Sequence, residues 1–177
     1  MSISFETKRL IIRKPTLHDA NDIYKNYTTD HEITKYLIWT PHKNVEESIS
    51  WIKLCIDKYD ENKSLVLIIE NRVNNEAIGM IDFKIEKYKA IFGYVLGKQY
   101  WNQGIMTEAM RPVIDYVLNK PEIYRIYATH YLENEKSGRV MQKLGMQLEG
   151  ILKKNTIYPN ISNIPLDDKI YSIVKDC

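Results

Sequence analysis

Cysteine is scarce in this chain, which has only two among its 177 residues, Cys55 and Cys177. They lie far apart in the sequence, and neither has a histidine or a second cysteine at the spacing of a metal-ligand set. The sequence therefore supports neither a disulfide framework nor a metal site. We expect two free thiols and no bound metal.

Long apolar runs and an excess of one charge are also missing. Glu6, Lys8 and Arg9 interrupt the first ten positions, so no signal-peptide core is present, and no later segment reads as a membrane span. The formal net charge is only +2, and no basic run is interleaved with aromatic residues. Nucleic-acid binding is therefore not predicted. We expect a cytoplasmic protein that binds neither membranes nor nucleic acids.

The signatures of several common enzyme classes are absent. The chain has no Gly-x-Gly-x-x-Gly, no Gly-x-x-x-x-Gly-Lys-Ser/Thr, no Gly-x-Ser-x-Gly and no His-Glu-x-x-His. These absences argue against a dinucleotide fold, a P-loop, a hydrolase elbow and a zinc protease. The histidines show no ligand spacing and are interpreted as surface or structural residues: His18, His31, His42 and His130.

The composition is that of an ordinary globular protein, with 44% hydrophobic and 27% charged residues. A chain of this length can bury a substantial core, and we expect one domain over residues 1–177. Hydrophobic periodicity predicts the element order β-α-α-β-β-β-α-β-α-β-β. The predicted strands are 7–13, 65–69, 77–85, 90–96, 125–131, 146–153 and 169–174, and the main helices are 16–28, 45–59, 105–118 and 134–144.

This order predicts an α+β fold, with a central, mostly antiparallel, twisted sheet of about seven strands and about four flanking helices. It differs from the regular alternation of a doubly wound parallel sheet. Thr16 and Asn134 are candidate helix N-caps, and Gly145 is a candidate left-handed helix stop. A further helical turn is expected within 33–38.

A strand, a short loop with one glycine, and a helix follow one another between Phe92 and Val117. The first backbone N–H groups of a helix have no intrahelical partner and carry partial positive charge. Such a helix start can bind a phosphate or pyrophosphate group. The same residues also fit an ordinary loop and helix start. The choice between a phosphate-binding site and an ordinary loop depends on the other elements of the chain.

The loop reads Trp101-Asn102-Gln103-Gly104-Ile105-Met106-Thr107-Glu108-Ala109. It resembles the pyrophosphate-binding loop of the GNAT superfamily of N-acetyltransferases, in its RimJ/RimL-like branch, which acetylates alanine or serine N-termini of ribosomal proteins. The resemblance extends over nearly the whole chain. Its further matches are Thr7 to Arg13, Asp19-Ala20, Phe92 to Leu96, Asn134, Ser137, Arg139 to Met141, Lys143 to Met146, Glu149-Gly150, Asp168 and Tyr171-Ser172.

The resemblance implies direct acetyl transfer from acetyl-CoA to an amine, in a fold whose fourth and fifth strands splay apart to admit the cofactor. A backbone N–H near Tyr94 or Val95 would polarise the thioester carbonyl, and Ser137 would protonate the departing sulfur. The positions implied to bind the cofactor are Tyr94, Val95, Leu96, Gln103, Gly104, Ile105, Met106, Thr107, Asn134, Ser137 and Lys143; those implied to be catalytic are Ser137 and Tyr94.

Some roles stay open at this point. Ser137 and Asn134 also fit helix capping, and Lys136, Arg139 and Lys143 fit a solvated face as well as a site for the cofactor's 3′-phosphate. Asp168 fits either an anchor for a cationic acceptor or a structural hydrogen bond.

The chain departs from the family pattern at two places. Met141 stands where many relatives have a proton-donating tyrosine, and Ile91-Phe92 stand where a basic glutamate is common. Asp82, Glu86 or a chain of water molecules are the alternatives for the base.

The resemblance favours an N-acetyltransferase acting on a primary amine, with a protein α-amine such as a ribosomal-protein N-terminus as the preferred acceptor. A polyamine or an aminoglycoside is the alternative acceptor. A CoA-binding regulatory module without turnover is the alternative class. Acceptor contacts are expected from the loops 33–43 and 158–165, and the protein is expected to be a monomer or a homodimer.

Overall fold

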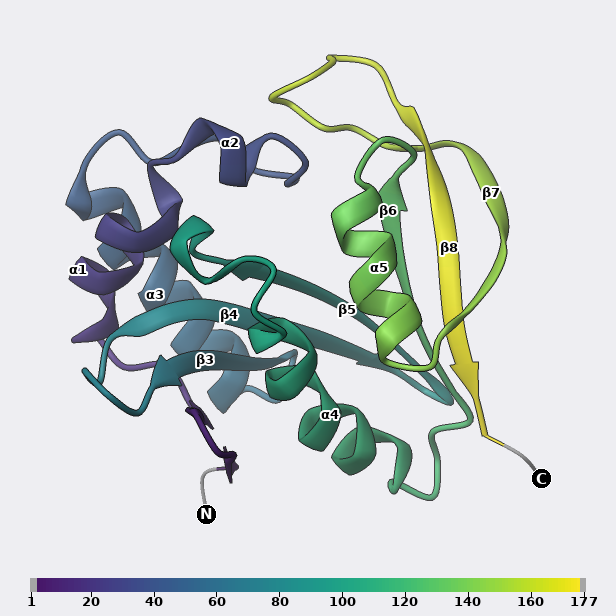
Figure 1. The fold of residues 1–177 in the computed structure, drawn as a ribbon, viewed down its shortest axis with the longest axis horizontal. Coiled ribbons are helices and arrows are strands. Elements are labelled where there is room, and N and C mark those ends of the chain that lie inside the picture. Colours follow the sequence, from purple (N-terminus) through teal and green to yellow (C-terminus); the bar gives the residue numbers. More distant parts are fainter. Residues whose placement is uncertain (1–2, 176–177) are drawn as a thin grey trace.

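The computed structural model describes residues 3–175, so the expected thiol of Cys177 lies outside the described residues. Eight strands form one sheet in the order β1-β2-β3-β4-β5-β6-β8-β7 (Figure 1). Every neighbouring pair is antiparallel except β5 and β6. The strands are β1 Ser4–Glu6, β2 Leu10–Arg13, β3 Leu65–Asn71, β4 Ala77–Glu86, β5 Lys89–Leu96, β6 Arg125–Tyr131, β7 Gln147–Thr156 and β8 Leu166–Val174.

Helices cover both faces of the sheet (Figure 1). α4 and α5 pack on one face around a core that contains Phe92, Met110 and Ile126. α1 and α3 pack on the other face around Ile23, Ile52 and Val95. The helices are α1 Asp19–Ile23, which continues as a π-helical turn Tyr24–Thr28, α2 His31–Thr34, α3 Val45–Asp60, a 3₁₀ turn Lys98–Tyr100, α4 Ile105–Leu118 and α5 Glu135–Lys143.

The predicted α+β architecture is confirmed, with one strand more than expected. The additional strand, β1, pairs with β2 through the register Phe5↔Ile12. The expected single strand 7–13 is therefore wrong at its start. Residues 7–9 form a turn instead, because the Thr7 N–H donates to Leu10 O at 2.9 Å and the Thr7 hydroxyl donates to Glu108 on α4 at 2.7 Å.

The expected cap at Thr16 is also wrong. The Thr16 N–H and hydroxyl both donate to the carboxylate of Asp19, at 2.7 and 3.1 Å. That carboxylate is buried and is paired with the Arg13 guanidinium through contacts of 2.6 and 2.9 Å. The ion pair between strand and helix therefore sets the helix start at Asp19, whereas local sequence suggested a hydroxyl cap.

The splay of β5 from β6 is confirmed. The two strands pair only at Lys89↔Arg125, Ala90↔Ile126 and Ile91↔Tyr127. Beyond these three pairs the strands diverge, as Figure 1 shows. Within residues 3–175, the backbone of Phe92–Leu96 therefore has no strand partner on the side that faces β6.

Cys55 is the cysteine within the described residues, and it is a free thiol on α3. Burial raises its pKa to about 12, so it is an unreactive core residue. No helix in residues 3–175 is long and apolar enough to cross a membrane.

Candidate functional site

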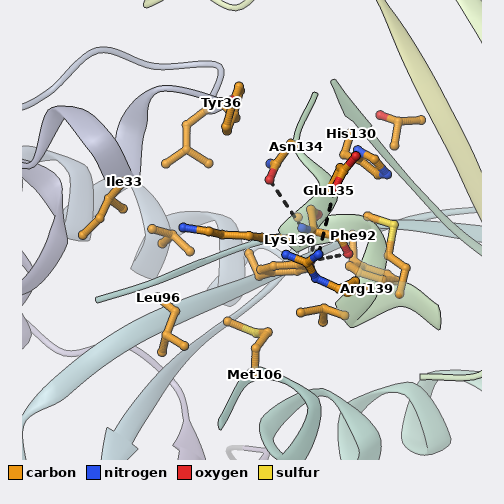
Figure 2. Close-up of a pocket in the computed structure, with 18 of the residues that line it drawn as sticks. Ile33, Tyr36, Phe92, Leu96, Met106, His130, Asn134, Glu135, Lys136 and Arg139 are labelled. Atoms are coloured by element: carbon orange, nitrogen blue, oxygen red, sulfur yellow. Dashed lines mark hydrogen bonds and ion pairs between the residues drawn. The ribbon is translucent and has the colours of Figure 1, made fainter. Parts of the chain in front are cut away.

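A cavity of about 1130 Å³ opens where β5 and β6 separate. Ligand pockets in proteins commonly occupy roughly 300–1,000 Å³, so this cavity has room for a large, extended ligand. Its walls come from the splayed strands, the loop before α4, the first turns of α5, the α2 region and β7. Figure 2 shows Glu135, Lys136 and Arg139 of α5, together with its N-cap Asn134, among the residues that line the cavity.

The loop before α4 turns sharply at two left-handed residues. Asn102 has φ 60° and Gly104 has φ 73°, and Gly104 is the N-cap of α4. A left-handed residue at this point directs the backbone of the first helical turn toward the cavity wall. Ile105 and Met106 bury their side chains in the core, so they can offer a ligand only their backbone. Gly104, Ile105, Met106 and Thr107 all line the cavity.

Gln103 lies apart from these residues and does not line the cavity. Its side chain donates to Gln99 O at 2.7 Å, and its carbonyl accepts from Arg9 Nη1 at 3.0 Å. Its predicted contact with a cofactor would therefore depend on its backbone N–H.

A brace between the N-terminal strands and the loop escaped the sequence analysis. Glu108 accepts hydrogen bonds from the Thr7 hydroxyl at 2.7 Å, from Arg9 N at 3.0 Å and from Arg9 Nε at 2.7 Å. Partial burial raises the pKa of Glu108, but these bonds outweigh that effect and lower it overall. Arg9 thus joins α4 to the carbonyl of Gln103. Because the partners are about a hundred residues apart in the chain, no local pattern reveals the brace.

Tyr94 and Ser137 meet inside the splay, where they join β5 to α5. The phenol oxygen of Tyr94 lies 2.8 Å from Ser137 Oγ and 3.3 Å from Ser137 O. Burial raises the pKa of the Tyr94 phenol, so the group stays protonated and can donate a proton or a hydrogen bond. The two residues predicted to be catalytic are therefore in direct contact.

Asn134 is the N-cap of α5, as predicted. Its Oδ1 accepts from Ser137 N at 3.4 Å. Gly145 adopts the predicted left-handed conformation after the same helix, with φ 84°. The capping bond uses the side-chain oxygen of Asn134 and not its side-chain nitrogen. Asn134 also lines the cavity.

Cationic side chains of α5 border the cavity near the loop: Lys136, Arg139 and Lys143. Lys136 Nζ lies 4.2 Å from the centroid of the Trp101 ring, which links α5 to the loop before α4. Arg139 faces Glu135 at 3.9 Å, one helical turn away. Lys136 therefore lies close to the predicted phosphate cradle, and Arg139 and Lys143 line the same cavity.

Tyr36 and Tyr158 line another part of the cavity, called here its aromatic end, and Tyr131 packs against both of them from outside the lining. The ring centroid of Tyr131 lies 5.8 Å from that of Tyr36 and 5.5 Å from that of Tyr158. The Asn160 amide donates to Thr34 O and to Trp39 O, both at 2.8 Å. These bonds hold together the two loops from which acceptor contacts are expected.

Asp168 organises the β7–β8 end of this region and is absent from the cavity lining. Its buried carboxylate accepts from Asn155 at 2.7 Å, from Thr156 at 2.6 Å and from the Tyr158 hydroxyl at 2.7 Å. The contacts favour the structural alternative for this residue.

We expect Asp168→Ala to lower the free energy of unfolding by about 3 kcal/mol, because the change removes a charged acceptor shared by three donors. Urea denaturation measures the loss. The matched control is Asp167→Ala, one residue away and bonded to exposed Lys153 and Lys154. Equal losses in the two variants would contradict a special role for Asp168.

His130 is buried in the wall of the cavity. The sequence analysis interpreted it as a surface or structural histidine. Its Nδ1 lies 2.7 Å from Tyr131 O, which makes Nδ1 the protonated nitrogen. Nε2 has no hydrogen-bond partner among residues 3–175. Burial lowers the pKa of the ring, so His130 is neutral near pH 7.

The chain matches the acetyltransferase (GNAT) domain over residues 9–147 and belongs to this family. An N-acetyltransferase of Bacillus subtilis, YoaA, whose function is uncharacterised, is 34% identical over 173 residues, 96% of each chain. The ribosomal protein uS5-alanine N-acetyltransferase of Escherichia coli is 30% identical over 82 residues, 44% of this chain and 42% of its own.

Among solved structures, the microcin C7 self-immunity acetyltransferase MccE, in complex with acetyl-CoA and AMP, superposes with a TM-score of 0.86. It is 25% identical, and the match covers 95% of this chain and 93% of the other. The chain is thus similar to these enzymes in sequence and in fold.

Proposed function

We propose that this protein transfers the acetyl group of acetyl-CoA to the α-amine of a protein or peptide. The observation that carries the proposal is the presence, in one cavity, of a helix N-terminus with a left-handed glycine and of the hydrogen-bonded pair Tyr94 and Ser137. The first feature suits a pyrophosphate and the second suits a thioester sulfur. Acetyl-CoA carries both groups and supplies the activated acyl carbon.

The residues of the cavity fit this cosubstrate. The backbone of Gly104–Thr107 would hold the pyrophosphate, and Lys136, Arg139 and Lys143 would add positive charge near it. The unpaired edge of Phe92–Leu96 would bond the amide groups of the pantetheine arm as an added strand does. A backbone N–H at Tyr94 or Val95 would polarise the thioester carbonyl.

The pair Tyr94 and Ser137 would return a proton to the departing thiolate. Many relatives use a tyrosine at the position of Met141, and this chain supplies a phenol from β5 instead. The raised pKa of Tyr94 keeps that phenol protonated, so its O–H stays available to the sulfur. Asn134 would hold the first turn of α5, and with it Ser137, at the site.

The acceptor would enter from the aromatic end, between the loops that Asn160 joins. The E. coli relative, which acts on a ribosomal protein, supports a protein N-terminus as the acceptor class. A ribosomal-protein acceptor would place the reaction in the cytoplasm. A polyamine or an aminoglycoside is the alternative acceptor.

Thiol release from acetyl-CoA tests the proposal against a panel of peptides with N-terminal alanine or serine, spermidine and an aminoglycoside. We expect turnover with at least one peptide and acetyl-CoA binding by calorimetry. Binding without turnover on any amine would favour a CoA-binding regulatory module. Absence of acetyl-CoA binding would overturn both alternatives.

A further inference from the structure

A primary amine is an ammonium ion near pH 7 and must lose a proton before it can attack a carbonyl carbon. The proposed function therefore needs a base on the acceptor side of the cavity. Ile91 and Phe92, which precede Gly93, are apolar and cannot act as one. Glu86 lies near the far end of β4, is bonded to Lys84 at 2.7 Å and does not line the cavity.

Asp82 on β4 is the carboxylate nearest to the predicted reaction centre along the strand register. It is directly opposite Gly93, next to the pairs Ile81↔Tyr94 and Met80↔Val95. Directly opposed residues of antiparallel strands lie roughly 4.5–5.5 Å apart and point to the same face. Asp82 is thus one residue pair away from the backbone groups proposed to hold the thioester carbonyl.

Gly93 keeps the space over Asp82 open. Among residues 3–175, no heavy atom outside its two chain neighbours would lie within 4 Å of a Cβ atom at position 93, and both Gly93 and Asp82 line the cavity. The absence of a side chain at position 93 therefore leaves the cavity open beside Asp82. A larger residue there would separate the two.

The sheet places Asp82 and Tyr94 on opposite faces. Tyr94 packs against the core under α4 and α5, together with Ile81. Met80 and Val95 belong to the core on the α3 face, and Asp82 follows Met80 by two residues on the same strand. A proton acceptor and a proton donor thus flank β5 on its two sides, as transfer between an incoming amine and a departing sulfur requires.

The surroundings of Asp82 leave its carboxylate able to take up a proton. Its Oδ1 is buried and has no hydrogen-bond partner within residues 3–175. Desolvation raises its pKa, and Ser64 and Lys58 offset that effect only in part. Two titratable groups of α3, Cys55 and Lys58, interact with it. Lys84 follows it by two residues on the same strand and is paired with Glu86.

We propose that Asp82 is the general base that removes the proton of the acceptor ammonium, an inference that rests on the proposed function. The proton passes from nitrogen to the Asp82 carboxylate, and the nitrogen lone pair forms the new C–N bond. The nitrogen, which still carries two protons after the attack, loses one of them to water as the tetrahedral intermediate collapses. The C–S bond breaks in that collapse, and the sulfur takes its proton from the Tyr94 phenol. Release of the Asp82 proton to water and return of a proton from water to Tyr94 restore the protein.

The test compares Asp82→Asn with Glu86→Gln, a matched loss of one carboxylate on the same strand. Thiol release is measured from pH 5 to 9 with acetyl-CoA and the best amine of the panel. We expect Asp82→Asn to lower kcat/KM about 100-fold, the usual scale for a lost general base. It should also remove the fall in rate on the acid side of the pH profile. In the wild-type protein that fall is expected above the pH at which an ordinary aspartate titrates, because desolvation raises the pKa of Asp82. Glu86→Gln should retain wild-type kinetics, and all variants should bind acetyl-CoA equally.

Wild-type rates and an unchanged pH profile in Asp82→Asn would overturn this inference alone, whereas a wild-type protein that turns over no amine would overturn the proposed function as well. If Asp82→Asn does not fold, Gly93→Val carries the test, because it closes the space over Asp82 without altering the carboxylate. We expect at least a tenfold loss of kcat/KM in that variant. Wild-type turnover by Gly93→Val would contradict the role of Asp82.

Discussion

Tyr94→Phe is expected to lower kcat about 100-fold and to leave the affinity for acetyl-CoA unchanged. The substitution keeps the ring, which is stacked on Phe92 with centroids 6.2 Å apart, and removes only the hydroxyl. Without the phenol, the departing sulfur would have Ser137 as its remaining side-chain donor at this position. Stopped-flow or steady-state thiol release measures kcat, and calorimetry measures the affinity.

A double-variant experiment separates a functional pair from two independent contacts. Because Tyr94 and Ser137 share one hydrogen bond of 2.8 Å, Tyr94→Phe combined with Ser137→Ala should cost little more than the worse single variant. Tyr88→Phe is the control, since Tyr88 lies in the turn between β4 and β5 and is exposed. Full activity of Tyr94→Phe would contradict the assignment of the proton donor.

Gly104→Val is expected to weaken acetyl-CoA binding at least tenfold. At φ 73° an L-residue is strained by roughly 1–2 kcal/mol, and a β-branched residue by more. Valine would therefore shift the loop and move the backbone N–H groups of the first turn of α4 away from the pyrophosphate. A tenfold change in affinity corresponds to about 1.4 kcal/mol, within the range of the strain.

Gly145→Val supplies the matched control for Gly104→Val. Gly145 has φ 84° and nothing within 4 Å of a Cβ position, and it lies outside the cavity. Both variants should lose stability in thermal unfolding, but only Gly104→Val should lose affinity for acetyl-CoA. Unchanged affinity in Gly104→Val would contradict the phosphate cradle.

Features that depend on neighbours in the sequence could be predicted. The strand Arg125–Tyr131, the Asn134 cap and the left-handed Gly145 follow from local patterning and from steric limits on the backbone. Long helices such as α3 show an apolar stripe that needs no tertiary information. The architecture follows from the order of these elements.

Features that depend on distant partners could not be predicted. The start of α1 is set by the Arg13 and Asp19 pair, and the loop before α4 is braced by Arg9 and Glu108. A side chain whose hydrogen-bond partners lie in another part of the sheet produces no periodic pattern in the sequence. For the same reason the sequence left Asp82 among several alternatives and gave no indication that Tyr94 contacts Ser137.

The short pairing of β5 with β6 also has a mechanical consequence. Three residue pairs join strands β1 to β5 to the half of the sheet formed by β6, β8 and β7. The bond between Tyr94 and Ser137 adds a link from β5 to α5 on the side where the two strands separate. The hydroxyl groups that are proposed to serve the sulfur thus also help to hold β5 and α5 together across the opening of the sheet.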